Sequence, residues 1–311
     1  MMPVFVSSIR FAAENVNIFE FSSVSGGVLT AVTPGAHIDV HLPNGLIRQY
    51  SLLRAEEKPI TYEIAVKRDS QSRGGSSFLF DEIKVGMVVE VGEPRNNFPL
   101  CEAAESSILV AGGIGITPIL CMARSLALRG AQFSLHYTCR SRQEAAFLKE
   151  VSAFSEYQIH IDEESDMQLL DLARIVQMAP ESAHIYCCGP KPMLSAFESA
   201  CADIPSERVH VEYFVPKHGD AAEGGFTIEL AKSGHSLYVP KGQRIIDVLR
   251  KNGVAVPTSC EQGVCGTCET KVLGGIPDHR DALLTESERA IGKTMMICCS
   301  GSLSDRLVLD L

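Results

Sequence analysis

The sequence lacks several features that would assign it to other classes of protein. Its 311 residues contain no apolar run of the roughly 18 residues that a transmembrane helix needs, and MMPVFVSSIR lacks the apolar core of a signal peptide. Lysine and arginine form no cluster and the formal net charge is −10, so we expect no nucleic-acid partner. Repeats and low-complexity tracts are also missing. These absences leave a chain of two or three globular domains that needs no membrane.

Cysteine, in contrast, is abundant. Eleven cysteines in a chain without an export signal indicate a reducing compartment, and the expected localisation is the cytoplasm. Most of those outside the C-terminal region, such as Cys121 and Cys187, lie in apolar runs. Ordinary packing explains these thiols better than disulfides do.

Four cysteines near the C-terminus follow the plant-type spacing of a [2Fe–2S] cluster, C-x4-C-x2-C-x29-C. A zinc site usually brings a second C-x2-C pair or paired histidines, which are missing here. Cys299 is an open alternative, because it directly follows the fourth cysteine. On a strand, consecutive side chains point to opposite faces, so only one of the two can bind the cluster. The spacing selects as metal ligands Cys260, Cys265, Cys268 and Cys298.

Residues 1–102 read as short strands of alternating hydrophobicity between turns, which predicts a small antiparallel β-barrel. RQYSLL lies on one of these strands, and KRDSQSRGGSSFLF passes through glycines into a short helix that we expect to be capped by a serine. A plain turn explains either motif alone, but together they fit a flavin. The ring would lie against Tyr50 with Ser51 near its N5 atom, and the phosphate would bind at Gly74, Gly75 and Ser76, with charge from Arg73.

Residues 103–216 change to strands that alternate with helices, which predicts a parallel sheet covered on both faces. Five strands are expected, and the helices include residues 117–130, 143–154 and 169–179. AGGIGITPI follows the first strand and opens a helix, so Gly112, Gly113, Gly115 and Thr117 suit a dinucleotide pyrophosphate. A tight strand–helix turn is the alternative. CCGPKPM ends a later strand at the same edge of the sheet, and Cys188 is expected to face the crevice there.

The polar segment 217–224 is predicted to be a linker. Residues 225–311 then give a hairpin, an amphipathic helix with Ile245, Ile246 and Leu249 facing inward, and the cysteine-bearing loop.

In this order, RQYSLL, GGIGITPI, CCGP and CEQGVCGTC resemble the phthalate dioxygenase reductase family, which includes the vanillate demethylase reductases. The resemblance covers essentially the whole chain. It implies an antiparallel β-barrel that binds FMN, an α/β NAD domain, and a C-terminal β-grasp ferredoxin of the plant type. It also implies electron transfer from NADH through FMN and the cluster to a Rieske-type terminal oxygenase of aromatic catabolism.

The resemblance assigns further roles to single residues. Arg48, Tyr50 and Ser51 would hold the flavin ring and its ribityl chain, and the phosphate loop favours FMN over FAD. Cys188 and Gly189 would lie near the nicotinamide, and Phe214 would cover the flavin face. Ser51 and Cys188 are thus the predicted catalytic residues. The basic turn at Arg140, Ser141 and Arg142 leaves NADPH open as an alternative to NADH.

A hydride donor delivers two electrons and the cluster accepts one, so the chemistry needs a flavin between them. Two alternatives to the oxygenase reductase remain at this point. The same redox chain could serve another acceptor, such as a haem oxygenase or a separate carrier, or the protein could be a redox sensor without catalytic function.

Overall fold

The structure is a computed structural model that describes residues 1–69, 74–216 and 225–311. These residues form two compact units, Met1–Glu212 and Tyr213–Leu311, and each has hydrophobic core residues of its own. Arg73 and the predicted linker 217–224 lie outside the described residues. Among the helices of the described ranges, none is long and apolar enough to cross a membrane.

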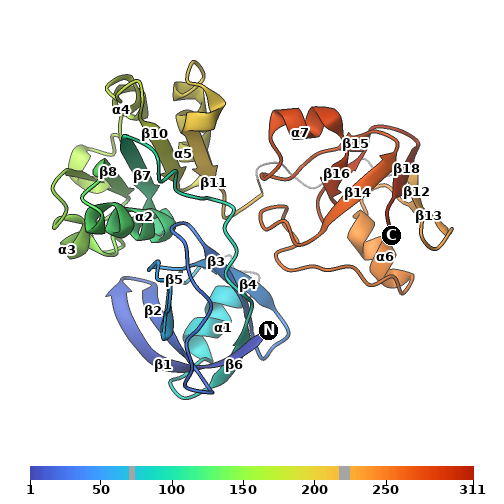
Figure 1. The fold of residues 1–311 in the computed structure, drawn as a ribbon, viewed down its shortest axis with the longest axis horizontal. Helices are drawn as coiled ribbons and strands as arrows, with labels where there is room; N and C mark the ends of the chain where they lie inside the picture. Colours follow the sequence, from blue (N-terminus) through green and yellow to red (C-terminus); the bar gives the residue numbers. More distant parts are fainter. Residues whose placement is uncertain (70–73, 217–224) are drawn as a thin grey trace. The chain divides into compact units, whose positions relative to one another are not determined.

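The first unit begins with an antiparallel β-barrel, as the alternation of its sequence predicted (Figure 1). Six strands follow the spatial order β4-β3-β6-β1-β2-β5, and a bridge between Leu52 and Ile64 joins the two edges. Alternate residues such as Val4, Val6 and Phe19 fill the interior. The helix α1 (Gly75–Asp81) adds Leu79 to this core. The strands are β1 (Met2–Ala13), β2 (Val16–Ser23), β3 (His37–His41), β4 (Ile47–Ser51), β5 (Thr61–Lys67) and β6 (Val88–Val91).

A five-stranded parallel sheet makes up the rest of the first unit, with the order β11-β10-β7-β8-β9. The chain starts in the middle at β7, moves outward to β8 and β9, and then returns to β10 on the other side of β7. The strand order therefore reverses between β7 and β10, and ligands of such sheets bind at the carboxyl ends of the two strands that flank this point. The elements are β7 (Ser106–Gly112), η1 (Gly113–Gly115), α2 (Ile116–Leu128), β8 (Gln132–Cys139), α3 (Leu148–Val151), β9 (Tyr157–Ile161), η2 (Asp162–Ser165), α4 (Leu172–Gln177), β10 (His184–Cys188), α5 (Lys191–Ala200), η3 (Ser206–Arg208) and β11 (Val209–Glu212).

Two of the predicted helices are shorter than expected. The helix predicted over 143–154 is reduced to α3, because Phe147 adopts a left-handed conformation with φ +62° just before it. This bend buries Ala146 and Phe147 in the core, and burial of these side chains outweighs the helical pattern of the segment. The helix predicted over 169–179 begins later, at α4, where the Asp171 carboxylate accepts a hydrogen bond from the Arg174 backbone N–H and caps it.

Besides its own interior core, the barrel shares a second buried cluster with the parallel sheet. Leu53 and Phe98 of the barrel region belong to the same buried cluster as Leu120 of α2. Polar contacts cross the same boundary: Arg124 Nη1 donates to the Leu53 carbonyl at 2.7 Å, and Lys67 pairs with Glu144 at 2.7 Å. The two sheets are therefore packed as one unit, although the sequence pattern changes near residue 103.

The second unit is a mixed sheet with the order β13-β12-β18-β14-β16 and the helix α6 packed against it. β12 and β18 run parallel, while the outer pairs are antiparallel, which is a β-grasp arrangement. Ile245, Ile246 and Leu249 of α6 are buried, as predicted. The elements are β12 (Phe226–Leu230), β13 (Ser236–Val239), α6 (Ile245–Lys251), β14 (Glu269–Gly274), β15 (Pro277–Asp278), α7 (Glu286–Ile291), β16 (Thr294–Met296), β17 (Gly301–Ser302) and β18 (Arg306–Leu309).

Candidate functional site

The predicted flavin residues gather where β4 meets the start of α1. Ser51 ends β4 and is only 5% exposed, and its Oγ has no hydrogen-bond partner among the residues that the structure describes. Tyr50 packs against the barrel core, and burial raises the pKa of its phenol, so it stays neutral. The Arg48 side chain lies directly over Gly75, where any Cβ would collide with it. A polar ligand that reached this corner would satisfy the buried hydroxyl of Ser51.

The start of α1 differs from the prediction in one respect. The N-cap is Gly74, not a serine, and no side chain caps the helix. Gly74 has φ +87°, a conformation that a side chain disfavours, so the turn depends on glycine. Ser76 lies inside the helix, and its hydroxyl accepts a hydrogen bond from the Asp69 N–H at 3.2 Å. The backbone N–H groups of the first turn of α1 are thus not capped by any side chain and lie beside Arg48.

His37 is a residue of this corner that the sequence reasoning missed. It pairs with Ser51 across β3 and β4, so the two side chains share one face of the sheet. Its Nε2 atom is buried and, within the described ranges, unpartnered. Burial and the nearby Arg95 charge lower the pKa of His37 to about 4, so the ring is neutral near pH 7. A histidine opposite a serine in the hairpin HIDVHLPNGLIRQYS was the signal that could have revealed it.

The predicted nucleotide glycines line the switch point of the parallel sheet. A Cβ on Gly115 would collide with the Cys188 carbonyl, and Gly112 and Gly189 pack closely, with a Cβ on Gly112 only 3.3 Å from the Gly189 Cα. Glycine is therefore needed to bring the carboxyl ends of β7 and β10 together. Gly113, at φ +52°, turns the chain into α2, whose first turn contains Thr117. The 13-residue helix α2 thus begins beside the carboxyl ends of these two strands.

Cys188 ends β10 but is fully buried, whereas the sequence predicted that it would face the crevice. Its thiol lies beside the Glu212 carboxyl at the end of β11. Part of Glu212 reaches the surface, yet its Oε2 is buried, and no partner for it exists in the described part of the chain. Burial raises the pKa of Glu212 to about 8, so the side chain is mostly a neutral acid near pH 7.

Glu212 is a second residue that the sequence reasoning missed. It sits in the alternating strand sequence RVHVEYF, where a glutamate reads as an ordinary exposed residue. A buried carboxylic acid with a strongly raised pKa at a ligand crevice is typical of a functional group. Phe214, two residues later, is 36% exposed and belongs to the second unit, so its role as a cover for the flavin stays a prediction.

The basic turn after β8 is neutralised by carboxylates that follow β9. Arg142 makes a bidentate pair with Glu164, with N–O distances of 2.7 and 2.8 Å, and Arg140 lies 3.9 Å from Glu163. Asp162 accepts a hydrogen bond from the Thr138 hydroxyl at 3.2 Å. Acidic side chains at the carboxyl ends of such strands favour the free ribose hydroxyl of NAD over the phosphate of NADP.

The four predicted cluster cysteines are all buried in the second unit, at 8% exposure or less. They lie as two pairs of neighbouring thiols, Cys260 beside Cys265 and Cys268 beside Cys298. The neighbouring thiols of Cys268 and Cys299 lower the pKa of Cys298, and the Gln262 N–H donates to the Cys260 sulfur at 3.2 Å. Nowhere in the described ranges do three metal-binding side chains form a site for a single ion. Two thiol pairs suit a two-iron cluster, which needs two protein ligands on each iron.

Cys298 and Cys299 do not lie on a strand, contrary to the expectation from the sequence. β16 ends at Met296, and both cysteines lie in the turn that follows, so strand alternation does not separate their side chains. Both are buried, at 1% and 2% exposure. Only the spacing still favours Cys298.

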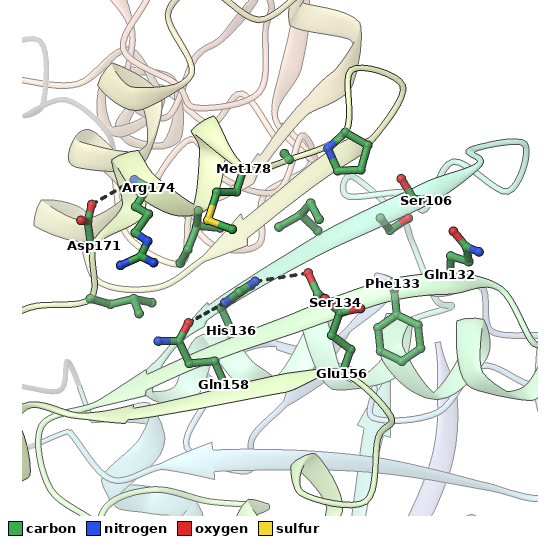
Figure 2. A pocket seen from close by; sticks show the side chains of 16 residues that line it. Ser106, Gln132, Phe133, Ser134, His136, Glu156, Gln158, Asp171, Arg174 and Met178 are labelled. Carbon is green, nitrogen blue, oxygen red and sulfur yellow. Dashed lines mark hydrogen bonds between the residues drawn. The ribbon is translucent and has the colours of Figure 1, made fainter.

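The first unit also contains a cavity of about 590 Å³ away from these sites (Figure 2). It lies between α4 and the amino-terminal parts of β7 and β8, at the opposite end of the sheet from the nucleotide crevice. His136 bridges Ser134 and Gln158 along its floor, with hydrogen bonds of 3.2 and 3.0 Å. This position separates the cavity from the predicted redox chemistry.

Known proteins resemble this chain over nearly its whole length. The sequence model of the 2Fe-2S iron-sulfur cluster binding domain matches residues 228–301, and that of the oxidoreductase NAD-binding domain matches residues 109–199. The phenoxybenzoate dioxygenase subunit beta of Ectopseudomonas oleovorans is 48% identical over 98% of this chain and 96% of its own length.

Several solved structures match the whole chain. A type IV self-sufficient cytochrome P450 monooxygenase matches with a TM-score of 0.89 and 36% identity, and the chain spans 41% of its length. Phthalate dioxygenase reductase, described as a modular structure for electron transfer from pyridine nucleotides to [2Fe-2S], matches with a TM-score of 0.75 and 39% identity over 98% of its length. On this similarity, together with the cysteine pairs, the glycine-lined crevice and the barrel corner, the chain belongs to the phthalate dioxygenase reductase family of NADH-dependent flavin and iron–sulfur oxidoreductases.

Proposed function

We propose that this protein is the reductase component of a two-component oxygenase and delivers electrons from NADH to a Rieske-type partner that acts on an aromatic ring or an O-methyl group. The observation that carries the proposal is the presence, in one chain, of a flavin-type barrel corner, a nucleotide crevice and two buried thiol pairs. FMN, when bound, accepts two electrons from NADH and releases them singly. The [2Fe–2S] cluster carries single electrons onward.

For the flavin, we infer that Arg48 and the backbone of Gly74, Gly75 and Ser76 bind the phosphate, with Arg73 adding charge. Tyr50 lies against the ring, and Ser51 donates its hydrogen bond toward N5, where charge develops during reduction. His37, on the same face as Ser51, supplies a second buried polar atom. The fit rests on two buried polar atoms for which the described residues provide no hydrogen-bond partner.

For the nucleotide, we infer that Gly112, Gly113, Gly115 and Thr117 bind the pyrophosphate of NADH, and that Cys188 and Gly189 lie near the nicotinamide. Because Cys188 is buried, its contribution is to hold Glu212 and the end of β10 in place. Phe214 would cover the flavin face. The ion pairs of Arg140 and Arg142 with Glu163 and Glu164 favour NADH over NADPH.

For the cluster, we infer that Cys260 and Cys265 bind one iron and that Cys268 and Cys298 bind the other, as their pairing suggests. We place the domain boundaries at 1–102 for the FMN barrel, 103–216 for the NAD domain, 217–224 for the linker and 225–311 for the ferredoxin domain. All eleven cysteines lie in the described residues and none forms a disulfide, which supports a reducing compartment such as the cytoplasm.

A haem oxygenase is the second candidate acceptor, favoured by the similarity to the self-sufficient P450 monooxygenase. Mass identification of the released flavin, with iron and sulfide counted on the same sample, tests the redox chain itself. FMN with about two irons per chain is expected. Rapid NADH-driven cytochrome c reduction would rule out a redox sensor. Product formation with a purified Rieske oxygenase, but not with a P450 domain, would then identify the acceptor class.

A further inference from the structure

Cys298 and Cys299 reach the cluster loop together because of the turn that carries them. The Met296 carbonyl accepts hydrogen bonds from the N–H groups of Cys299 and Ser300, at 3.3 and 3.0 Å, and so the chain reverses directly after β16. In such a turn, consecutive side chains are not forced to opposite faces, as they are on a strand. The two thiols hydrogen-bond each other.

Both sulfurs also touch the same residue of the loop. Gly263 lies between Cys260 and Cys265, and its backbone is close enough to the Cys298 sulfur to lower the pKa of that thiol. The Cys299 sulfur also lies against this glycine, where a Cβ would stand only 2.5 Å from it. The loop therefore has two candidate sulfurs, not one, at its fourth corner.

Only weak polar contacts hold the Cys299 thiol in its present position. Its sulfur lies 3.7 Å from the Met296 carbonyl oxygen and 3.8 Å from the Ser300 hydroxyl, and thiols are weak donors and acceptors. A rotation of this side chain costs little beyond repacking. The other three predicted ligands differ, since none of them has a neighbouring cysteine in the sequence.

We propose that Cys299 is an alternative fourth ligand of the [2Fe–2S] cluster and can replace Cys298 without loss of the cluster; this rests on the proposed cluster site. In the exchange, the iron–sulfur bond to Cys298 breaks and one to Cys299 forms. Cys299 releases its proton and Cys298 takes one up, so no electron is gained or lost.

The test compares full-length variants purified without oxygen: Cys298→Ala, Cys299→Ala, the double variant, and Cys268→Ala as a matched control. Cys268 is the partner of Cys298 in the same thiol pair but has no substitute nearby. Iron and sulfide per chain, visible absorption and the electron paramagnetic resonance of the reduced protein are the measurements. Bound FMN reports whether the first unit of each variant is folded, and the circular dichroism of each variant, compared with the wild type, reports whether the second unit is folded.

We expect Cys298→Ala and Cys299→Ala each to keep about two irons per chain, and the double variant and Cys268→Ala to lose them. The spectrum of Cys298→Ala should shift, because the new ligand approaches from a different backbone position. Loss of iron in either single variant, with FMN retained, overturns the inference but leaves the proposed function intact. A wild-type protein without iron would defeat the proposed function itself.

Cys298→Ser provides a second comparison if the alanine variant does not fold. With Cys299 as ligand, the spectra of Cys298→Ser and of Cys298→Ser combined with Cys299→Ala differ. Identical spectra would show that Cys299 does not bind and would overturn the inference.

Discussion

Ser51, His37 and Glu212 each bury a polar atom that has no partner in the described structure. Burial of an unpaired polar group lowers the stability of the folded state by on the order of 1–3 kcal/mol. Such a group is therefore retained only where another interaction or a function offsets this cost. All three stand where the barrel or the parallel sheet is predicted to meet a ligand. Sequence patterns alone identified only Ser51, because His37 and Glu212 occupy strand positions where polar residues are ordinary.

The hydroxyl of Ser51 can be tested by its removal. Ser51→Ala should slow reduction by NADH roughly 10- to 100-fold, since it deletes a donor to an atom where charge develops. FMN should remain bound, because the phosphate contacts are untouched. Stopped-flow bleaching of the flavin measures the rate. Ser23→Ala, on the strand β2 of the same barrel, is the control, and an unchanged rate in Ser51→Ala would show that the hydroxyl has no part in the step.

The buried acid Glu212 should make stability depend on pH. Its pKa is about 8 in the folded protein, against 4.5 when exposed, so the folded state holds the extra proton between these pH values. Stability contributed by this proton is fully present below pH 4.5 and is lost as the pH rises through about 8. Glu212→Gln, which stays neutral, should avoid this loss.

Urea denaturation followed by circular dichroism at pH 5 to 9 measures the effect. The difference between the free energies of unfolding of Glu212→Gln and of the wild type should increase in favour of the variant as the pH rises. The increase should be on the order of a few kcal/mol at pH 8. Glu207→Gln, at an exposed position of η3, should show no such trend. Parallel curves for the wild type and Glu212→Gln would mean that the carboxyl ionises freely.

Among the elements, strands and long helices were predictable because their burial follows a simple period. β1 and β2, the five strands of the parallel sheet, and α2 all match the expected segments. The predictions for short segments were wrong where a tertiary contact outweighed the local sequence pattern. Burial of Phe147 shortened α3, and Gly74 takes the place of the expected serine cap of α1. The prediction of a strand through MMICCS was also wrong. The Met296 carbonyl accepts two hydrogen bonds from the residues that follow, and these bonds end the strand in a turn.

The 3-10 helix η2 is the element that should set nucleotide choice. Its carboxylates pair with the two arginines of the preceding turn, which makes these cations less available to a 2′-phosphate. Glu164→Lys should free Arg142 and raise kcat/KM for NADPH relative to NADH, roughly tenfold. Steady-state kinetics with both nucleotides check this. Glu181→Lys makes the same charge change before β10, at the other end of the sheet, and should leave the ratio unchanged.

At the scale of the molecule, the two units divide the chemistry. The barrel and the parallel sheet share a core, so the flavin corner and the nucleotide crevice are held in one rigid unit. The cysteine pairs belong to the other unit, which folds around its own core of α6 and the mixed sheet. Loss of the cluster should therefore leave hydride transfer intact and interrupt only the later electron transfer.

Cys268→Ala separates these two stages in the whole protein. Because the first unit contains none of the cluster cysteines, flavin reduction by NADH should stay within about twofold of the wild-type rate. Turnover of the terminal oxygenase should fall at least roughly 100-fold, since the single-electron carrier is lost. Stopped-flow reduction and product formation on the same preparation measure both stages. Oxygenase turnover at the wild-type rate by an iron-free variant would mean that electrons leave directly from the flavin, and the second unit would then need another role.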